Sequence, residues 1–162
     1  MTNHSASDHT PRLDTGRLAP EVHRAMLELD RAASAGIDPG LAELVRIRAS
    51  QLNRCAFCLD MHTTDALATG ESAERIAHLS AWEVSRHCYT DKELAALELT
   101  EALTVAANGS ASDLALAKAA RHFDERELTH LIATVIAINV LNRLAISVRM
   151  TPGYYARGSR RR

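Results

Sequence analysis

Apolar and polar residues alternate along this chain with the period of a helix. Over residues 18–35 apolar side chains recur every three to four positions, at Val22, Met26, Leu29 and Ala33, and Gly36 follows as a stop signal. Strands are not favoured, because β-branched and aromatic residues do not alternate with polar ones over any sizeable stretch. The pattern therefore predicts an amphipathic helix here and a helical protein overall.

Six further helices are expected on the same grounds. Asp38 is a suitable N-cap for the second, with Pro39 at its first position, and Asn53 can cap a third that starts near Cys55. The expected helices after the first span residues 39–52, 55–69, 71–84, 91–106, 112–120 and 125–149. The last is apolar around nearly its whole circumference over residues 131–146, so its own domain or another subunit must bury most of its sides. We expect one all-α domain of about seven helices.

The chain has 162 residues, which fits one domain with a core of its own. We expect a flexible leader over residues 1–17, the helical domain over residues 18–150 and a basic flexible tail over residues 151–162. The net charge of -1 provides no basic field for nucleic acid. The N-terminus lacks the apolar stretch of a secretory signal, and residues 131–141 are about half the roughly 20 residues that cross a bilayer, so no membrane association is expected.

Three cysteines without an export signal favour the reducing cytoplasm, where paired cysteines are usually catalysts or metal ligands. Cys55 and Cys58 form a Cys-x-x-Cys motif at the start of the third helix. Free backbone N–H groups and the helix dipole there stabilise a thiolate, lowering a thiol pKa from about 8.5 toward roughly 3.5 to 7.5. His62 follows Cys58 by four residues on the same helix face and could exchange a proton with it. The motif predicts a redox dithiol.

These residues also allow two other interpretations. The cysteines could be small buried side chains, which is how we interpret Cys88, because it has no partner at useful spacing. Cys55, Cys58 and His62 could instead bind zinc. However, Cys55 and His62 would be about 10 Å apart along the helix axis, and no fourth ligand lies nearby in sequence, so no metal site is expected. Glu43, near a helix start, would ordinarily complement the helix dipole.

Glu43, Cys55, Cys58 and His62 also form one spaced motif: a Glu, a Cys twelve residues on, a second Cys three residues on, and a His four residues further. With the residues between them, they resemble the core motif of the alkylhydroperoxidase D-like proteins, which belong to the carboxymuconolactone decarboxylase superfamily. The segments 89–104 and 137–143 resemble this family as well, so the similarity extends over about residues 18–149.

The resemblance implies roles for the four residues of the motif. Cys58 would be the peroxidatic cysteine and Cys55 its disulfide partner, while Glu43 and His62 would relay protons. A dithiol donor, either a protein or a small molecule, would reduce the disulfide, and no metal, haem, flavin or other cofactor would be needed. Phe57 occupies the position before the second cysteine where some relatives carry an extra His.

The resemblance also implies a homo-oligomer, commonly a trimer or a hexamer. For Asn139, Asn142 and Arg143, the polar residues of the last helix, we favour structural hydrogen bonds over contacts to a substrate. The function expected is a thiol-dependent peroxidase that reduces hydrogen peroxide or organic hydroperoxides. The alternatives are a lactone decarboxylase, whose chemistry does not call for a redox dithiol, and a non-enzymatic module for thiol redox sensing or disulfide exchange.

Overall fold

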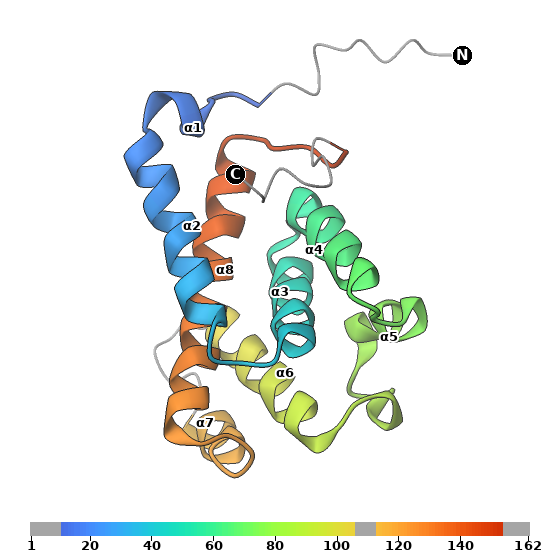
Figure 1. Cartoon of the computed structure of the whole chain (residues 1–162). Helices are drawn as coiled ribbons and strands as arrows, with labels where there is room; N and C mark the ends of the chain where they lie inside the picture. The colour runs from blue at the N-terminus through green and yellow to red at the C-terminus, as the bar shows by residue number, and fades with distance from the viewer. Residues whose placement is uncertain (1–10, 106–112, 154–162) are drawn as a thin grey trace, which may run out of the picture.

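The computed structural model describes residues 11–105 and 113–153, and every regular element in these ranges is helical (Figure 1). The α-helices are α1 (Thr15–Leu18), α2 (Pro20–Ser34), α3 (Pro39–Asn53), α4 (Ala56–Ala68), α5 (Ala73–His78), α6 (Asp91–Thr104), α7 (Asp113–Ala119) and α8 (Glu125–Ser147). Two short 3-10 turns, η2 (Leu79–Ala81) and η3 (Arg86–Cys88), lead from α5 to α6. The predicted all-α fold is confirmed, and each of the seven expected helices has a counterpart among these elements.

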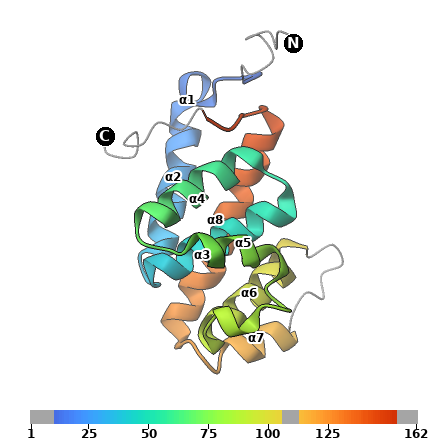
Figure 2. The same cartoon turned by 90° about the vertical axis from the view of Figure 1, so that its right-hand side faces the viewer.

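Helix α3 lies in the middle of the bundle, against α4, α6 and α8 (Figures 1 and 2). Ten of its fifteen residues are buried, which explains why its polar residues form internal contacts. One apolar cluster joins α3 to α6, α7 and α8, and it includes Leu41, Val45, Leu99, Leu131 and Val135. A second joins α3 to the segment from α4 to α6, and it includes Leu44, Ile47, Leu79, Trp82 and Leu97.

The helix starts follow the capping signals of the sequence with one exception. Asp38 accepts a hydrogen bond from the backbone N–H of Leu41, and Asp124 begins α8 with a capping box, as expected. The expectation that Asn53 caps the third helix is wrong. Asn53 is the last residue of α3, and its side-chain amide instead donates to Asn139 and Asn142 on α8, at 2.9 and 2.8 Å. Its amide is thus committed to joining α3 to α8.

Helix α2 packs along α8 (Figure 1), and its buried face matches the predicted stripe only in part. Ala33 of the stripe is buried, but Val22 and Leu29 are 47% and 41% exposed, and Asp30, outside the stripe, is buried. Gly36 follows the helix as predicted, but with an additional reason: a Cβ on this residue would lie 2.1 Å from the ring of His130. The glycine therefore permits a close approach between the end of α2 and α8.

Helix α8 passes as a membrane-spanning helix by length and composition alone, with a mean hydropathy of 1.5. A central helix of a bundle passes the same test, and α8 contacts α2, α3, α4 and α6. Its burial is partial, because Ile136 and Ile146 are 51% and 46% exposed. Cover by another subunit therefore stays a prediction.

Residues 15–17 of the expected leader belong to α1, whereas residues 1–10, the turn expected at Asn108-Gly109 and residues 154–162 lie outside the described residues.

Candidate redox site

The Cys-x-x-Cys motif lies at the junction of α3 and α4. Arg54 leaves α3 in the left-handed conformation, with a φ of 56°, and Cys55 then serves as the N-cap of α4. The backbone N–H of Cys55 donates to the carbonyl of Ser50, and that of Cys58 donates to the Cys55 sulfur at 3.4 Å. The two cysteines form a disulfide with a Cα–Cα distance of 5.4 Å. Both sulfurs are therefore at the positive end of α4, as the sequence predicts.

The two cysteines differ in whether they border a cavity. Each residue is only 2% exposed, and both pack against Ala145 of α8 together with Phe57 and Met150. Cys58 lines a cavity, whereas Cys55 is not among the residues that line it. A small molecule that enters the cavity therefore meets Cys58.

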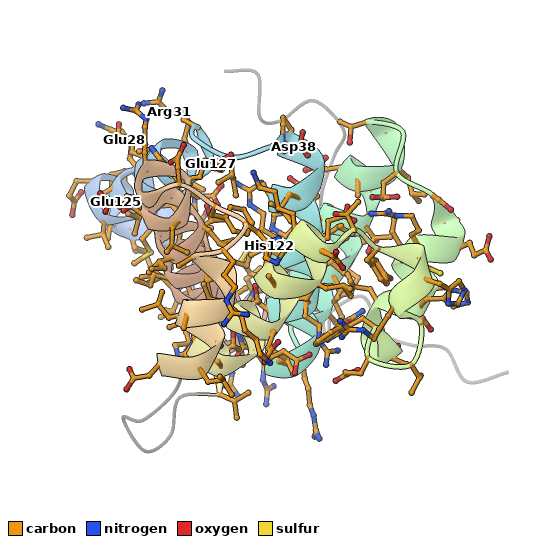
Figure 3. The ribbon with its side chains drawn as sticks, turned by 90° about the horizontal axis from the view of Figure 1, so that it is seen from below. Glu28, Arg31, Asp38, His122, Glu125 and Glu127 are labelled. Atoms are coloured by element: carbon orange, nitrogen blue, oxygen red, sulfur yellow. A yellow bond between two sulfur atoms is a disulfide. The ribbon has the colours of Figure 1, made fainter. Side chains whose placement is uncertain are left out.

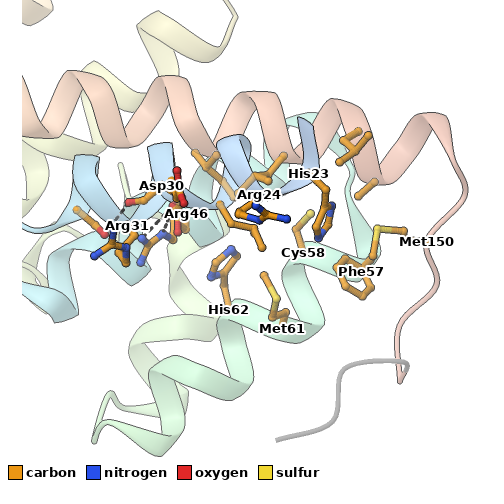
Figure 4. Close-up of a pocket in the computed structure, with 17 residues that line it drawn as sticks. His23, Arg24, Asp30, Arg31, Arg46, Phe57, Cys58, Met61, His62 and Met150 are labelled. Carbon is orange, nitrogen blue, oxygen red and sulfur yellow. Dashed lines mark hydrogen bonds and ion pairs between the residues drawn. The ribbon is translucent and has the colours of Figure 1, made fainter. Parts of the chain in front are cut away.

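The imidazole of His62 belongs to a chain of buried charged groups that runs from α4 through α3 to α2, and Figure 4 shows its last link, between Arg46 and Asp30. His62 is fully buried, and its Nδ1 lies 2.9 Å from Oε2 of Glu43. The other oxygen of Glu43 accepts a 2.7 Å bond from Nη1 of Arg46. The Nε and Nη2 atoms of Arg46 both donate to Oδ1 of Asp30, at 3.1 and 2.9 Å.

This chain of contacts fixes how the imidazole is oriented. An ionised Glu43 can only accept a hydrogen bond, so it requires the hydrogen on Nδ1 of a neutral His62. The remaining nitrogen, Nε2, is buried and has no hydrogen-bond partner among the described residues. Its lone pair is then available to take a proton, and His62 lines the same cavity as Cys58.

The cavity has a volume of about 680 Å³ and lies between α2, α4 and α8. Its apolar wall consists of Leu27, Phe57, Met61, Ile138, Leu141, Leu144 and Met150, with Ala145 beside the cysteines. Helix α2 adds polar side chains to the lining: His23, Arg24, Glu28, Asp30, Arg31 and Ser34. Figure 4 draws His23 and Arg24 at the same cavity as His62 and Cys58, and the view from below shows Glu28 and Arg31 at the outer edge of the bundle (Figure 3). The size is that of a site for an organic molecule.

The structure thus brings all four residues of the motif together: Glu43, Cys55, Cys58 and His62. Sequence reasoning missed Asp30 and Arg46. Arg46 follows Glu43 by three residues on one helix, and this spacing could have indicated their ion pair. No local signal in the sequence links Asp30 to Arg46 or to Glu43. No group of three or more His, Cys, Asp or Glu side chains that could hold a metal ion occurs in the described ranges.

Cys88 lies away from this cavity, in the 3-10 turn before α6. It is half-buried, and its sulfur is 3.6 Å from Nδ1 of His78, a partner ten residues away that its spacing did not suggest. Nearby, burial raises the pKa of Tyr89 to about 12, against the lowering effect of Arg75, whose guanidinium lies over the ring. The neutral phenol donates to the carbonyl of Arg75. This region is separate from the dithiol.

Comparison with known proteins identifies the family of this chain. The model of the carboxymuconolactone decarboxylase family matches residues 20–102. The uncharacterized protein YdfG of Bacillus subtilis (strain 168) is 36% identical over 138 residues, which cover 85% of this chain and 93% of YdfG. The uncharacterized protein YnjA of Escherichia coli (strain K12) is 30% identical over 99 residues, 61% of this chain and 53% of YnjA.

Among solved structures, the crystal structure of ATU0492 from Agrobacterium tumefaciens superposes with a TM-score of 0.84 at 31% identity. The match covers 90% of this chain and all of ATU0492, a protein of unknown function described as a candidate antioxidant defence protein AhpD. The family match includes α3, α4 and the complete Glu-Cys-Cys-His motif. The chain therefore belongs to the carboxymuconolactone decarboxylase family and has the alkylhydroperoxidase D-like fold.

Proposed function

We propose that the protein is a thiol-dependent peroxidase that reduces organic hydroperoxides through Cys55 and Cys58. The observation that carries the proposal is the arrangement of one cavity: a cysteine of a disulfide-forming pair lines it, together with a histidine whose free nitrogen is buried there. The cavity wall is mainly apolar, which suits an organic peroxide.

The first step uses Cys58 as the nucleophile, because it is the cysteine that the cavity reaches. In the reduced protein, Nε2 of His62 accepts the proton of the Cys58 thiol. The thiolate attacks the terminal oxygen of the peroxide, so that an S–O bond forms and the O–O bond breaks. The alkoxide that leaves takes the proton from His62 and departs as an alcohol. Cys58 is then a sulfenic acid.

The second step closes the disulfide. Cys55, whose Cα lies 5.4 Å from that of Cys58, attacks the sulfenic sulfur, and an S–S bond replaces the S–O bond. The hydroxide that leaves takes the proton of the Cys55 thiol and becomes water. The balance is one dithiol and one hydroperoxide giving one disulfide, one alcohol and one water. A dithiol donor then restores the pair by exchange.

Glu43 supports the first step from behind the histidine. Its carboxylate holds the Nδ1 hydrogen of His62 and stabilises the imidazolium that forms when the thiol gives up its proton. Phe57, where some relatives carry a second histidine, is part of the cavity wall and provides apolar contact to a substrate instead.

The remaining expectations are proposals as well. We propose a homo-oligomer, a trimer or a hexamer, whose contacts cover apolar side chains that one chain leaves exposed, such as Val22, Leu29 and Ile136. We also propose that the protein works in the cytoplasm, where a dithiol donor can keep Cys55 and Cys58 reduced.

The proposal is tested by peroxide consumption in the presence of dithiothreitol. Wild-type protein should consume cumene hydroperoxide over many turnovers, whereas Cys58→Ser should not. Cys88→Ser is the matched control, because Cys88 lies outside the cavity, and it should keep wild-type activity. Turnover that survives Cys58→Ser would refute the proposal. Stoichiometric disulfide formation without turnover would instead favour a module for redox sensing or disulfide exchange.

A further inference from the structure

Asp30 is a buried carboxylate on a helix that faces mainly outward. Of the fifteen residues of α2, all of which the structure describes, Asp30 and Ala33 are the buried ones. The side chain of Asp30 points to Arg46 on α3 (Figure 4) and accepts both the Nε and the Nη2 hydrogen bonds on one oxygen. A buried charge at this position requires an explanation, because an apolar side chain would suit the core equally well.

Stability alone does not provide that explanation. The side chains of Asp30 and Arg46 are 10% and 6% exposed, so both charges have lost most of their hydration. Buried ion pairs recover this loss incompletely, and apolar replacements of both partners are often as stable or more stable. What the pair does provide is direction. A guanidinium is a planar, rigid fork, so fixing Nε and Nη2 also fixes where Nη1 points.

Nη1 of Arg46 points at Oε1 of Glu43, at 2.7 Å. With that oxygen held, the other oxygen of Glu43 is directed at Nδ1 of His62. Nε2 of His62 has no partner among the described residues that could hold the ring from its other side. The proton position on the imidazole therefore depends on Glu43, and the place of Glu43 depends on Arg46.

We propose that Asp30 is a positioning residue: through Arg46 and Glu43 it keeps the hydrogen of His62 on Nδ1 and the lone pair of Nε2 toward the cavity. Helix α2 therefore contributes to the proton relay as well as to the cavity wall. The catalytic consequence rests on the proposed peroxidase function, but the effect on the imidazole does not.

The test is Asp30→Ala, which removes the oxygen that accepts from both Nε and Nη2 of Arg46. The matched control is Glu21→Ala, which removes an exposed carboxylate at the start of the same helix. In reduced protein, the ¹⁵N signals of the His62 ring report which nitrogen carries the hydrogen. We expect the Nδ1–H form in wild type and in Glu21→Ala, and a mixture of both tautomers in Asp30→Ala.

The same variants are then mixed with cumene hydroperoxide, and the loss of thiols is followed over a range of peroxide concentrations. Asp30→Ala should lower the maximal rate on the order of tenfold, as loss of an outer partner of a catalytic group does. The half-saturating concentration should change less than about twofold, because the Asp30 carboxylate, although it borders the cavity, is bound to Arg46. Should Asp30→Ala fail to fold, Arg46→Lys gives the second test, since an ammonium cannot reproduce the fork.

A wild-type tautomer signal together with a wild-type maximal rate in a folded Asp30→Ala or Arg46→Lys protein would overturn the inference. A tautomer change in Asp30→Ala, in a protein whose wild type does not react with peroxide, would support the positioning role and refute the peroxidase. The two failures are therefore distinguishable.

Discussion

Replacing Glu43 by Gln tests the relay with almost no change of shape. Arg46 can only donate hydrogen bonds, so the single oxygen of a Gln amide would turn toward Nη1 of Arg46. The NH₂ group would then face Nδ1 of His62 and donate to it, which moves the ring hydrogen to Nε2. A neutral imidazole in that form cannot accept the proton of Cys58.

The size of the effect follows from the ionisation of a free thiol. With an ordinary pKa of about 8.5, a cysteine is roughly 3% thiolate at pH 7. If His62 keeps Cys58 fully ionised in wild type, Glu43→Gln lowers the rate with peroxide by up to about 30-fold at pH 7, and by less where the start of α4 itself stabilises the thiolate. At pH 9 the free thiol is about three-quarters ionised, so the loss should shrink below about twofold.

The assay mixes reduced protein with excess cumene hydroperoxide, quenches with acid and counts the remaining thiols, so that no reductant takes part. Arg46 retains Asp30 as its partner in the variant, and circular dichroism should show a folded protein. Glu83→Gln, an exposed carboxylate away from the cavity, is the control. A wild-type rate at pH 7, or a loss of equal size at pH 7 and pH 9, would refute the reasoning.

Three other changes test the packing and the cavity. Asn142→Ala removes two side-chain hydrogen bonds between α8 and α3, one of them buried, and should lower the free energy of unfolding by about 2–4 kcal/mol in a urea titration; an unchanged midpoint would contradict the structural role. Gly36→Ala places a Cβ against the ring of His130 and should cost about 1–3 kcal/mol in the same measurement, whereas a neutral effect would show that the ring can move away. Leu141→Trp narrows the cavity, so kcat/KM for cumene hydroperoxide should fall on the order of tenfold while that for hydrogen peroxide stays within about twofold; an equal loss for both would argue against the cavity as the substrate site.

The helical fold could be predicted from the sequence because its signals are local. Capping residues such as Asp38 and Asp124 begin their helices where the pattern predicts, and apolar periods mark each helix in between. The prediction that Asn53 caps a helix was wrong. An Asn before a helix is a good cap, but the Asn53 side chain here forms tertiary hydrogen bonds with Asn139 and Asn142. A local preference of about 1 kcal/mol is easily overridden in this way.

The exposed face of α2 could not be predicted, for a related reason. Periodicity identifies an apolar stripe that includes the buried Ala33 and the exposed Val22 and Leu29, but it does not say which neighbour covers each part of that stripe. Asp30 would ordinarily be placed on the solvent side, and its burial depends on Arg46, sixteen residues further along the chain. Such pairings over a distance leave no trace in local pattern.

At the redox site, helix spacing alone placed Cys55, Cys58 and His62 together, because they lie within two turns of one helix start. Glu43 is nineteen residues from His62, and only the family resemblance indicated that the two belong to one site. Only the structure shows that Cys58 lines the cavity and that Cys55 does not. The two cysteines are equally buried, so burial alone does not distinguish them.

The most direct test of the central claim traps the first oxidised state of Cys58. In Cys55→Ser protein no partner can form the intramolecular disulfide, so one equivalent of cumene hydroperoxide should leave Cys58 as a sulfenic acid. Dimedone added at once should label that cysteine, and peptide mass spectrometry should find the label on Cys58 with Cys88 unmodified. Label absent from Cys58, or found equally on Cys88, would contradict a peroxidase built on this dithiol.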